Sequence, residues 1–299
     1  MKAFAFWARR VFNAVSRKTL ALISRTGLAV QPSVDLLSVE ENSDQKMKKS
    51  CLLALVVTSA LSINAVFADD NFAKSVIDYN PGTGFAAGYT NPATALGAPS
   101  QINPYTEAVD PFDPPYGTAQ IVSLGAGGSL TIKFDDVVHN RSQNPFGLDF
   151  IIFGNSGFII TNDYDLVNYD WIGTPATDGS LFANNTGATR VSVSRDGKKF
   201  YVLNPAPLAD GLFPTDGAGD PAVPVNPTLT AAHFAGQTLD GIRALYRGSA
   251  GGTGYDISTA RDEKGRRVSI SSIKYVRIEA LSGKAEIDAL SAVRREKKD

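Results

Sequence analysis

Short runs of alternating apolar and polar residues dominate the chain after about residue 70. In residues 129–134 (SLTIKF) every second side chain is apolar, and residues 190–194 (RVSVS) alternate in the same way. Successive side chains of a β-strand point to opposite faces, so each run predicts a strand with one buried face. Residues 149–153 (DFIIF) are apolar on both faces, which predicts a central strand.

Turn signals connect these runs. Asp196-Gly197 lies between residues 190–194 and the next apolar run, residues 199–203 (KFYVL), and predicts a hairpin because such a turn needs positive φ. Near the end of the chain, residues 274–279 (KYVRIE) and 285–290 (AEIDAL) flank a Leu-Ser-Gly-Lys turn. We expect these last two strands to pair antiparallel.

Two segments have helical patterns. In residues 91–97 Asn91 is placed as N-cap, with proline at the first helical position and glycine at the stop. Residues 238–248 put Leu239, Ile242, Leu245 and Tyr246 on one stripe, with Gly248 as C-cap. The strands show no fixed repeat and are not separated by regular helices. The sequence therefore predicts an all-β fold, an antiparallel β-sandwich with one or two short helices.

Residues 47–68 have the features of an export signal. Lys48 and Lys49 precede an apolar run over residues 51–66, and small residues close the segment at Ala68. The run is shorter than the ~20 residues that a spanning helix needs. We expect a signal peptide cleaved after Ala68, and a secreted, cell-surface or periplasmic mature protein with no membrane span. The alternative is an uncleaved anchor.

The segment before Met47 is basic and unlike the rest of the chain. We expect residues 1–46 to be a mis-called start upstream of the true initiator Met47; the alternative is a genuine, disordered leader. Residues 69–293 are then a single β-sandwich domain, followed by a charged tail over residues 294–299.

Composition limits the classes of function. The 299 residues are 43% hydrophobic and 20% charged with a formal net charge of −1, which is ordinary globular composition. Lysine and arginine are scattered apart from the tail, so the charge balance gives no drive toward nucleic acid. The single cysteine, Cys51, lies in the predicted signal, so the mature protein has no disulfide and no catalytic thiol.

Several motifs together resemble known proteins. Residues 191–203 (VSVSRDGKKFYVL), 274–280 (KYVRIEA) and 285–293 (AEIDALSAV) resemble the galactose-binding-like, discoidin-type jelly roll. With residues 123–134, 147–158 and 239–257, they look like an uncharacterised group of exported bacterial surface proteins, many of which end in a cell-surface sorting tail. This chain departs from the group in having Gly154 where glutamate is usual, and in ending in charged residues instead of the sorting tail.

The resemblance implies a structural calcium ion. In discoidin-like jelly rolls the glutamate that opens the last strand often joins backbone carbonyls of an early loop around one ion. Glu286 matches that glutamate, and residues 89–98 match the early loop, where Asn91 and Leu96 are the expected carbonyl ligands. The alternative is a surface glutamate.

Residues 162–171 contain the most ligand-like chemistry. Tyr164, Tyr169 and Trp171 lie among acidic side chains that include Asp165 and Asp170. A sugar presents an apolar ring face and a rim of hydroxyls, which aromatic rings beside carboxylates can satisfy. These five residues are the predicted ligand site. The alternative is that the aromatic rings only fold this loop onto the sandwich.

No catalytic constellation stands out from the sequence. The two histidines, His139 and His233, lie in unrelated contexts, and residues 154–158 (GNSGF) lack the nucleophile-elbow spacing. The glycine-rich residues 248–255 lack the ending of a phosphate loop and predict a turn between helix and strand. Carboxylates are plentiful, so a glycosidase pair stays open.

We therefore expect no enzyme but an exported binding module, carbohydrate-binding or adhesive, whose partner is a glycan or a cell-surface or matrix component. One alternative is a structural component of an extracellular layer or matrix. A glycan hydrolase is the third.

Overall fold

The computed structural model describes residues 71–103, 108–182, 187–209, 211 and 213–294. Most of them form one compact unit; Asp165–Asp170 lies outside this unit and is described by itself. The expected leader, signal peptide and most of the charged tail lie outside the described residues. Within the described ranges, no helix combines the length and apolarity that a membrane crossing requires.

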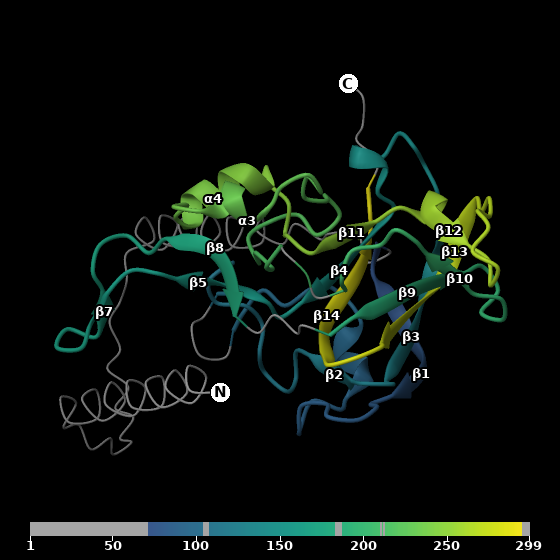
Figure 1. The fold of residues 1–299 in the computed structure, drawn as a ribbon, viewed down its shortest axis with the longest axis horizontal. Helices are drawn as coiled ribbons and strands as arrows, with labels where there is room; N and C mark the ends of the chain where they lie inside the picture. The colour runs from purple at the N-terminus through teal and green to yellow at the C-terminus, as the bar shows by residue number, and fades with distance from the viewer. Residues whose placement is uncertain (1–70, 104–107, 183–186, 210, 212, 295–299) are drawn as a thin grey trace, which may run out of the picture. The chain divides into compact units, whose positions relative to one another are not determined.

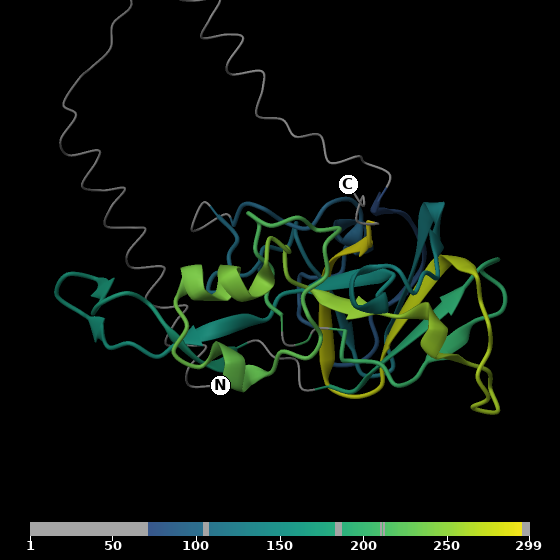
Figure 2. The same ribbon diagram turned by 90° about the horizontal axis from the view of Figure 1, so that it is seen from above.

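The larger sheet has six antiparallel strands. In spatial order they are β1 (Ala73–Asn80), β3 (Ser129–His139), β13 (Ser272–Ala280), β9 (Thr189–Ser194), β10 (Tyr201–Leu203) and β12 (Ala260–Arg261). The second sheet has four strands, also antiparallel. Its order is β11 (Thr253–Tyr255), β4 (Phe150–Gly154), β14 (Lys284–Ala292) and β2 (Val122–Gly125). The two sheets face each other as the predicted β-sandwich (Figures 1 and 2).

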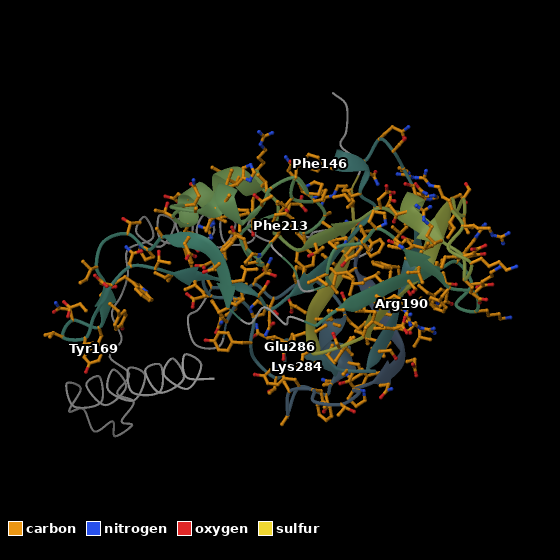
Figure 3. All side chains as sticks on the ribbon, viewed as in Figure 1. Phe146, Tyr169, Arg190, Phe213, Lys284 and Glu286 are labelled. Carbon is orange, nitrogen blue, oxygen red and sulfur yellow. The ribbon has the colours of Figure 1, made fainter. Side chains whose placement is uncertain are left out.

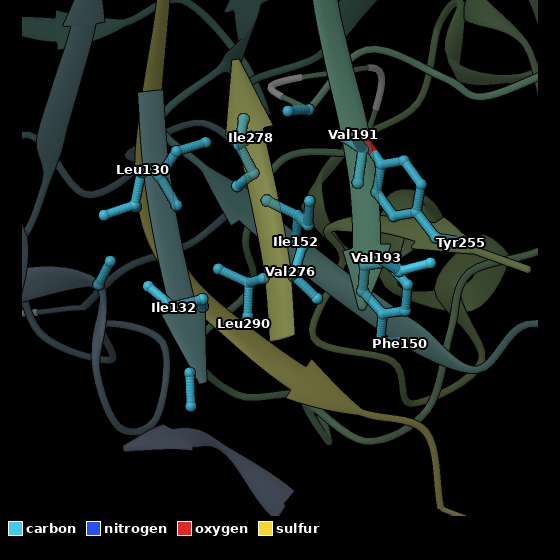
Figure 4. Close-up of a cluster of buried hydrophobic side chains, with 14 of the residues drawn as sticks. Leu130, Ile132, Phe150, Ile152, Val191, Val193, Tyr255, Val276, Ile278 and Leu290 are labelled. Carbon is cyan, nitrogen blue, oxygen red and sulfur yellow. The ribbon is translucent and has the colours of Figure 1, made fainter. Parts of the chain in front are cut away.

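Alternation along the strands builds the core between the sheets (Figure 4). Leu130, Ile132 and Phe134 of β3 are all buried, as their period of two predicts. Strand β4 is buried on both faces, which confirms the prediction of a central strand. Its Phe150 and Ile152 belong to the core between the sheets, whereas Ile151 and Phe153 pack with Ala250 and Ala289 on the outer face.

One predicted pairing is wrong. Strands β13 and β14 do not form a hairpin, because β13 pairs with β3 and β9 while β14 pairs with β2 and β4. The turn after Ala280 crosses from one sheet to the other, with Gly283 at φ +63°. Val276 of β13 and Ile287 of β14 thereby enter the same core from opposite sheets. Alternation specifies a buried face but not the neighbouring strand, so it could not distinguish a hairpin from such an arch.

The predicted hairpin at Asp196-Gly197 is confirmed. β9 pairs antiparallel with β10, and Gly197 has φ +73°. The Asp196 carboxylate accepts backbone hydrogen bonds from Lys198 (2.9 Å) and Lys199 (3.1 Å), which close the turn.

A smaller apolar cluster lies outside the sandwich. It is built by β5 (Gly157–Ile160), β8 (Thr177–Phe182), α3 (Ala231–Phe234) and α4 (Leu239–Tyr246), which Figure 1 shows side by side. The buried side chains at its centre are Phe112, Phe158, Val225, Phe234, Ile242 and Tyr246. The predicted stripe of α4 faces this cluster. The predicted C-cap is one residue off, because Arg247, at φ +52°, is the left-handed residue that ends α4.

The remaining elements are short. They are the 3₁₀ turns η2 (Pro92–Ala95), η3 (Pro145–Gly147) and η4 (Ile257–Thr259), and a two-stranded sheet of β6 (Tyr164–Asp165) and β7 (Asp170–Trp171). Element η2 confirms the helical pattern predicted at Asn91, whose side chain accepts from the Ala93 N–H at 3.2 Å. The glycine-rich segment after α4 is a turn, as predicted, and leads into β11.

Candidate functional site

Two of the predicted ligand residues are in contact. The rings of Tyr164 and Trp171 meet edge to face, with centroids 5.0 Å apart and planes 78° apart. Both side chains are half-buried. The edge of one ring against the face of the other is the arrangement that aromatic quadrupoles favour.

Asn162 fixes the backbone next to this aromatic pair. Its side-chain amide donates to the carbonyls of Ile172 and Thr174, each at 3.1 Å, and its Oδ1 accepts from the Ala176 N–H at 2.8 Å. The Ile172 N–H donates to the carbonyl of Asp163 at 2.8 Å. The aromatic pair therefore stands on a segment held by hydrogen bonds to main-chain atoms.

Asp165–Asp170 contains the other predicted ligand residues. The Asp165 carboxylate accepts from the backbone N–H of Val167 (2.7 Å) and from the side-chain amide of Asn168 (2.6 Å). These hydrogen bonds lower the pKa of Asp165. Its carboxylate thus closes a local turn, a role that the sequence analysis did not assign. Tyr169, at φ +56°, and Asp170 are exposed.

The predicted calcium ligand Glu286 is a buried residue of β14, so the alternative of a surface glutamate is wrong. Its Oε2 accepts from the Asn155 side-chain amide at 2.7 Å. Its Oε1 accepts from the Ser123 hydroxyl at 3.4 Å and from the Lys284 ammonium at 3.2 Å. Figure 3 labels Lys284 and Glu286 at the same end of β14.

These partners do not fit a calcium ion. Calcium takes six to eight oxygen ligands, whereas the Asn155 amide and the Lys284 ammonium approach Glu286 as donors. The expected carbonyl ligand Asn91 already accepts from the Thr94 hydroxyl at 2.8 Å, within η2 itself. Leu96 is the C-cap of the same element. Among the described residues, no group of three or more histidine, cysteine or acidic side chains forms a metal cluster. Calcium stays a prediction that the surroundings of Glu286 do not favour.

A different acid of β14 reaches the segment that follows η2. Asp288 accepts from the Ser100 N–H (2.8 Å) and from the Ser100 hydroxyl (2.7 Å). The pairing of β14 with β4 is irregular between Ile287 and Ala289, so Asp288 is the extra residue of a bulge. Burial raises the pKa of Asp288 to about 7. The sequence offered no signal for this bulge.

Two further acids have raised pKa values. Burial raises the pKa of Asp149 to about 6, although its carboxylate accepts from the backbone of Arg141 and Ile257, each at 2.9 Å. Burial, together with repulsion from Asp110, raises the pKa of Asp113 to about 6. Asp110 caps its own turn by accepting from the Phe112 N–H at 2.8 Å.

A shallow depression of about 510 Å³ lies near one edge of the four-stranded sheet. It is lined by Tyr89, Ile102, Tyr116, Gly117, Thr118, Ala119 and Gln120. The Tyr89 hydroxyl donates to the carbonyl of Tyr116 at 2.6 Å. Both polar ends of the Gln120 amide bind nearby main-chain atoms, of Ile102 and Gly117. These hydrogen bonds hold together the loops that line the depression.

The two histidines lie in unrelated elements, as their sequence contexts indicate. His139 is an exposed residue at the end of β3, and His233 belongs to the capping box of α3 with Thr230.

No protein-family model matches this chain, and no curated protein matches it with significance.

Proposed function

We propose that the chain is an exported, non-catalytic binding module that recognises carbohydrate through the segment around Tyr164 and Trp171. The edge-to-face ring pair is the observation that supports this proposal most directly. Asn162 holds the backbone beside it, which reduces the entropy lost on binding. Exposed Asp163 supplies acceptors for sugar hydroxyls at the same segment.

The surroundings of the buried acids favour binding over catalysis. Each of Asp149, Glu286 and Asp288 accepts hydrogen bonds from its own chain. The bonds of Glu286 and Asp288 connect loops to β14, and those of Asp149 connect the residue before β4 to Arg141 and Ile257. A glycosidase needs one acid with a raised pKa facing a second carboxylate across the substrate. Asp113 beside Asp110 and Asp149 beside Asp256 come near to such a pair. However, the Asp110 and Asp256 carboxylates each accept a backbone hydrogen bond within their own turn.

A structural role in an extracellular layer is the second candidate. It is favoured by exposed apolar side chains: Ile172, next to Trp171 in the chain, is 60% exposed, and Ile159 of β5 is 38% exposed. Apolar groups gathered at a surface are typical of contacts between proteins.

The test is a glycan array probed with the full chain and with Trp171→Ala. We expect a subset of glycans to bind, and we expect Trp171→Ala to lose most of that binding. Phe85→Ala is the matched control, because Phe85 is a partly exposed aromatic residue (36%) on a different turn. Silence on the array together with concentration-dependent self-assembly would instead favour the layer component.

Export is tested separately, on the protein as its natural host produces it. We expect the mature N-terminus to be Asp69. Recovery of a peptide that spans Ala68 and Asp69 from the secreted fraction would contradict cleavage at this bond.

A further inference from the structure

Basic side chains that look scattered in the sequence come together at one end of the six-stranded sheet. The β9–β10 turn and the turn after β12 are far apart in the chain, but β10 pairs with β12, with Val202 opposite Arg261. Because this pairing is antiparallel, the two turns lie beside each other at the same end of the sheet. Figure 3 shows many nitrogen-tipped side chains at this end. The basic residues of the two turns are Arg195, Lys198, Lys199, Arg261, Lys264, Arg266 and Arg267, which we call the basic end.

The acids within these turns are largely engaged locally. The Asp196 carboxylate is directed at the N–H groups of its own turn, and its pKa is lowered mainly by those backbone bonds. Asp262 pairs with Arg266 at 2.7 Å and accepts from the Lys264 N–H at 2.9 Å. The seven basic residues face three acids in the same two turns, Asp196, Asp262 and Glu263, which leaves a formal excess of four positive charges (7 − 3). The basic end therefore carries excess positive charge in a chain whose formal net charge is −1.

Cations at and beside the basic end stand over aromatic rings. Phe200 lies beneath the Arg277 guanidinium, 4.0 Å from ring centroid to Cζ, and the Lys199 ammonium stands 5.2 Å from the centroid of the Tyr201 ring. Arg277 also donates to the Thr131 hydroxyl at 3.1 Å. Charges presented on ordered turns lose less entropy on binding than charges on a disordered tail.

We propose that the basic end binds an acidic polysaccharide, through the carboxylate or sulfate groups along the polymer. Repeated anions spaced along a chain suit several cations spread over two adjacent turns. This surface differs from the aromatic segment of the proposed function, and neither site needs the other.

Two observations favour a polysaccharide over other polyanions. The large exposed apolar side chains of the described residues lie elsewhere, and the turns of the basic end hold none to insert into a lipid surface. Binding of single-stranded nucleic acid relies on aromatic faces open to bases, whereas Phe200 and Tyr201 are half-buried beneath cations.

The test measures binding of the full chain to polygalacturonate, to sulfated dextran and to neutral dextran. We expect binding to one or both acidic polymers, no binding to neutral dextran, and a marked loss of affinity when NaCl is raised from about 50 to about 300 mM, because exposed charges are screened. A single-stranded oligonucleotide and phosphatidylserine vesicles are the comparison ligands and should bind more weakly.

Paired charge removals separate the basic end from general charge. Lys198→Gln with Lys264→Gln should weaken binding to the acidic polymer about fivefold to tenfold. Arg247→Asn with Arg294→Gln removes the same charge at other positions and should leave binding within about twofold; asparagine tolerates the left-handed backbone of Arg247. Equal losses in both double variants, or stronger binding to the oligonucleotide or the vesicles, would overturn the proposal. Trp171→Ala should not alter polymer binding. The proposal for the basic end can therefore fail or succeed independently of the proposed aromatic site.

Discussion

The carboxylate of Asp288 holds Ser100 by two hydrogen bonds, one from the backbone N–H at 2.8 Å and one from the hydroxyl at 2.7 Å. The two residues are 188 positions apart in the chain. Their contact fastens the segment after η2 to the bulge of β14. Asp288 is buried, so this contact is made at the cost of removing a carboxylate from water.

Burial of Asp288 predicts a particular dependence of stability on pH. Its pKa is raised from 3.8 to about 7 in the folded protein, so between these values the folded state binds more protons than the unfolded state. The stabilisation that Asp288 gives the fold is therefore fully present below about pH 4 and falls as pH rises. Above about pH 7 it no longer changes with pH. Asp288→Asn should lack that decline.

Urea unfolding of both proteins at pH 4 and pH 8 measures the effect. The free energy of unfolding of Asp288→Asn minus that of wild type should be larger at pH 8 than at pH 4, by on the order of 4 kcal/mol at most. The control is Asp178→Asn, because hydrogen bonds from Ser180 lower the pKa of exposed Asp178 below its ordinary value of 3.8. Its titration therefore lies below the tested range, and this variant should change little relative to wild type between pH 4 and pH 8. A stability difference between wild type and Asp288→Asn that is flat with pH would refute a raised pKa.

The hydrogen bond between Asn155 and Glu286 should stabilise the fold. Asn155→Ala would remove a donor at 2.7 Å from a buried carboxylate, at a cost of about 2–3 kcal/mol in the free energy of unfolding. Asn155→Asp should cost more, because it places a second negative charge beside the first. Chemical denaturation measures both. Asn226→Ala, in an exposed turn, is the control and should change stability by less than about 1 kcal/mol.

Chelation tests the calcium prediction. Glu286 is surrounded by hydrogen-bond donors, so we expect EDTA to leave the melting temperature unchanged. A ligand that binds only the folded state raises the melting temperature, and its removal lowers it. The melting temperature would instead fall with EDTA and recover with added calcium if the ion binds. Glu286→Gln would then remove this response.

The sequence predicted the strands better than it predicted their neighbours. Period two placed Leu130 and Ile132 correctly in the core, and Asn91 marked the start of η2. Strand partners depend on contacts between distant residues, so the arch between β13 and β14 was mistaken for a hairpin. The apolar cluster under α4 was missed for the same reason, since it combines residues as distant as Phe112 and Tyr246.

The candidate sites follow the same pattern. The aromatic composition of residues 162–171 was visible in the sequence, and the contact of Tyr164 with Trp171 agrees with it. The role of Asp165 as a turn cap is equally local and was nevertheless missed. The basic end could not be read from the sequence, because it depends on the pairing of β10 with β12.

The approach of β8 to α3 requires a glycine. Gly179 has φ +88°, and a Cβ on it would overlap the backbone carbonyl of Ala231. Gly84 has a similar φ of +76°, but a Cβ there would meet open space. Gly84→Ala should therefore cost only the strain of the left-handed backbone, about 1–2 kcal/mol. Gly179→Ala should add the steric overlap and cost at least about 3 kcal/mol in the free energy of unfolding. Denaturant titration of the two variants under one condition compares them directly, and equal losses would mean that α3 does not pack against β8 as closely as described.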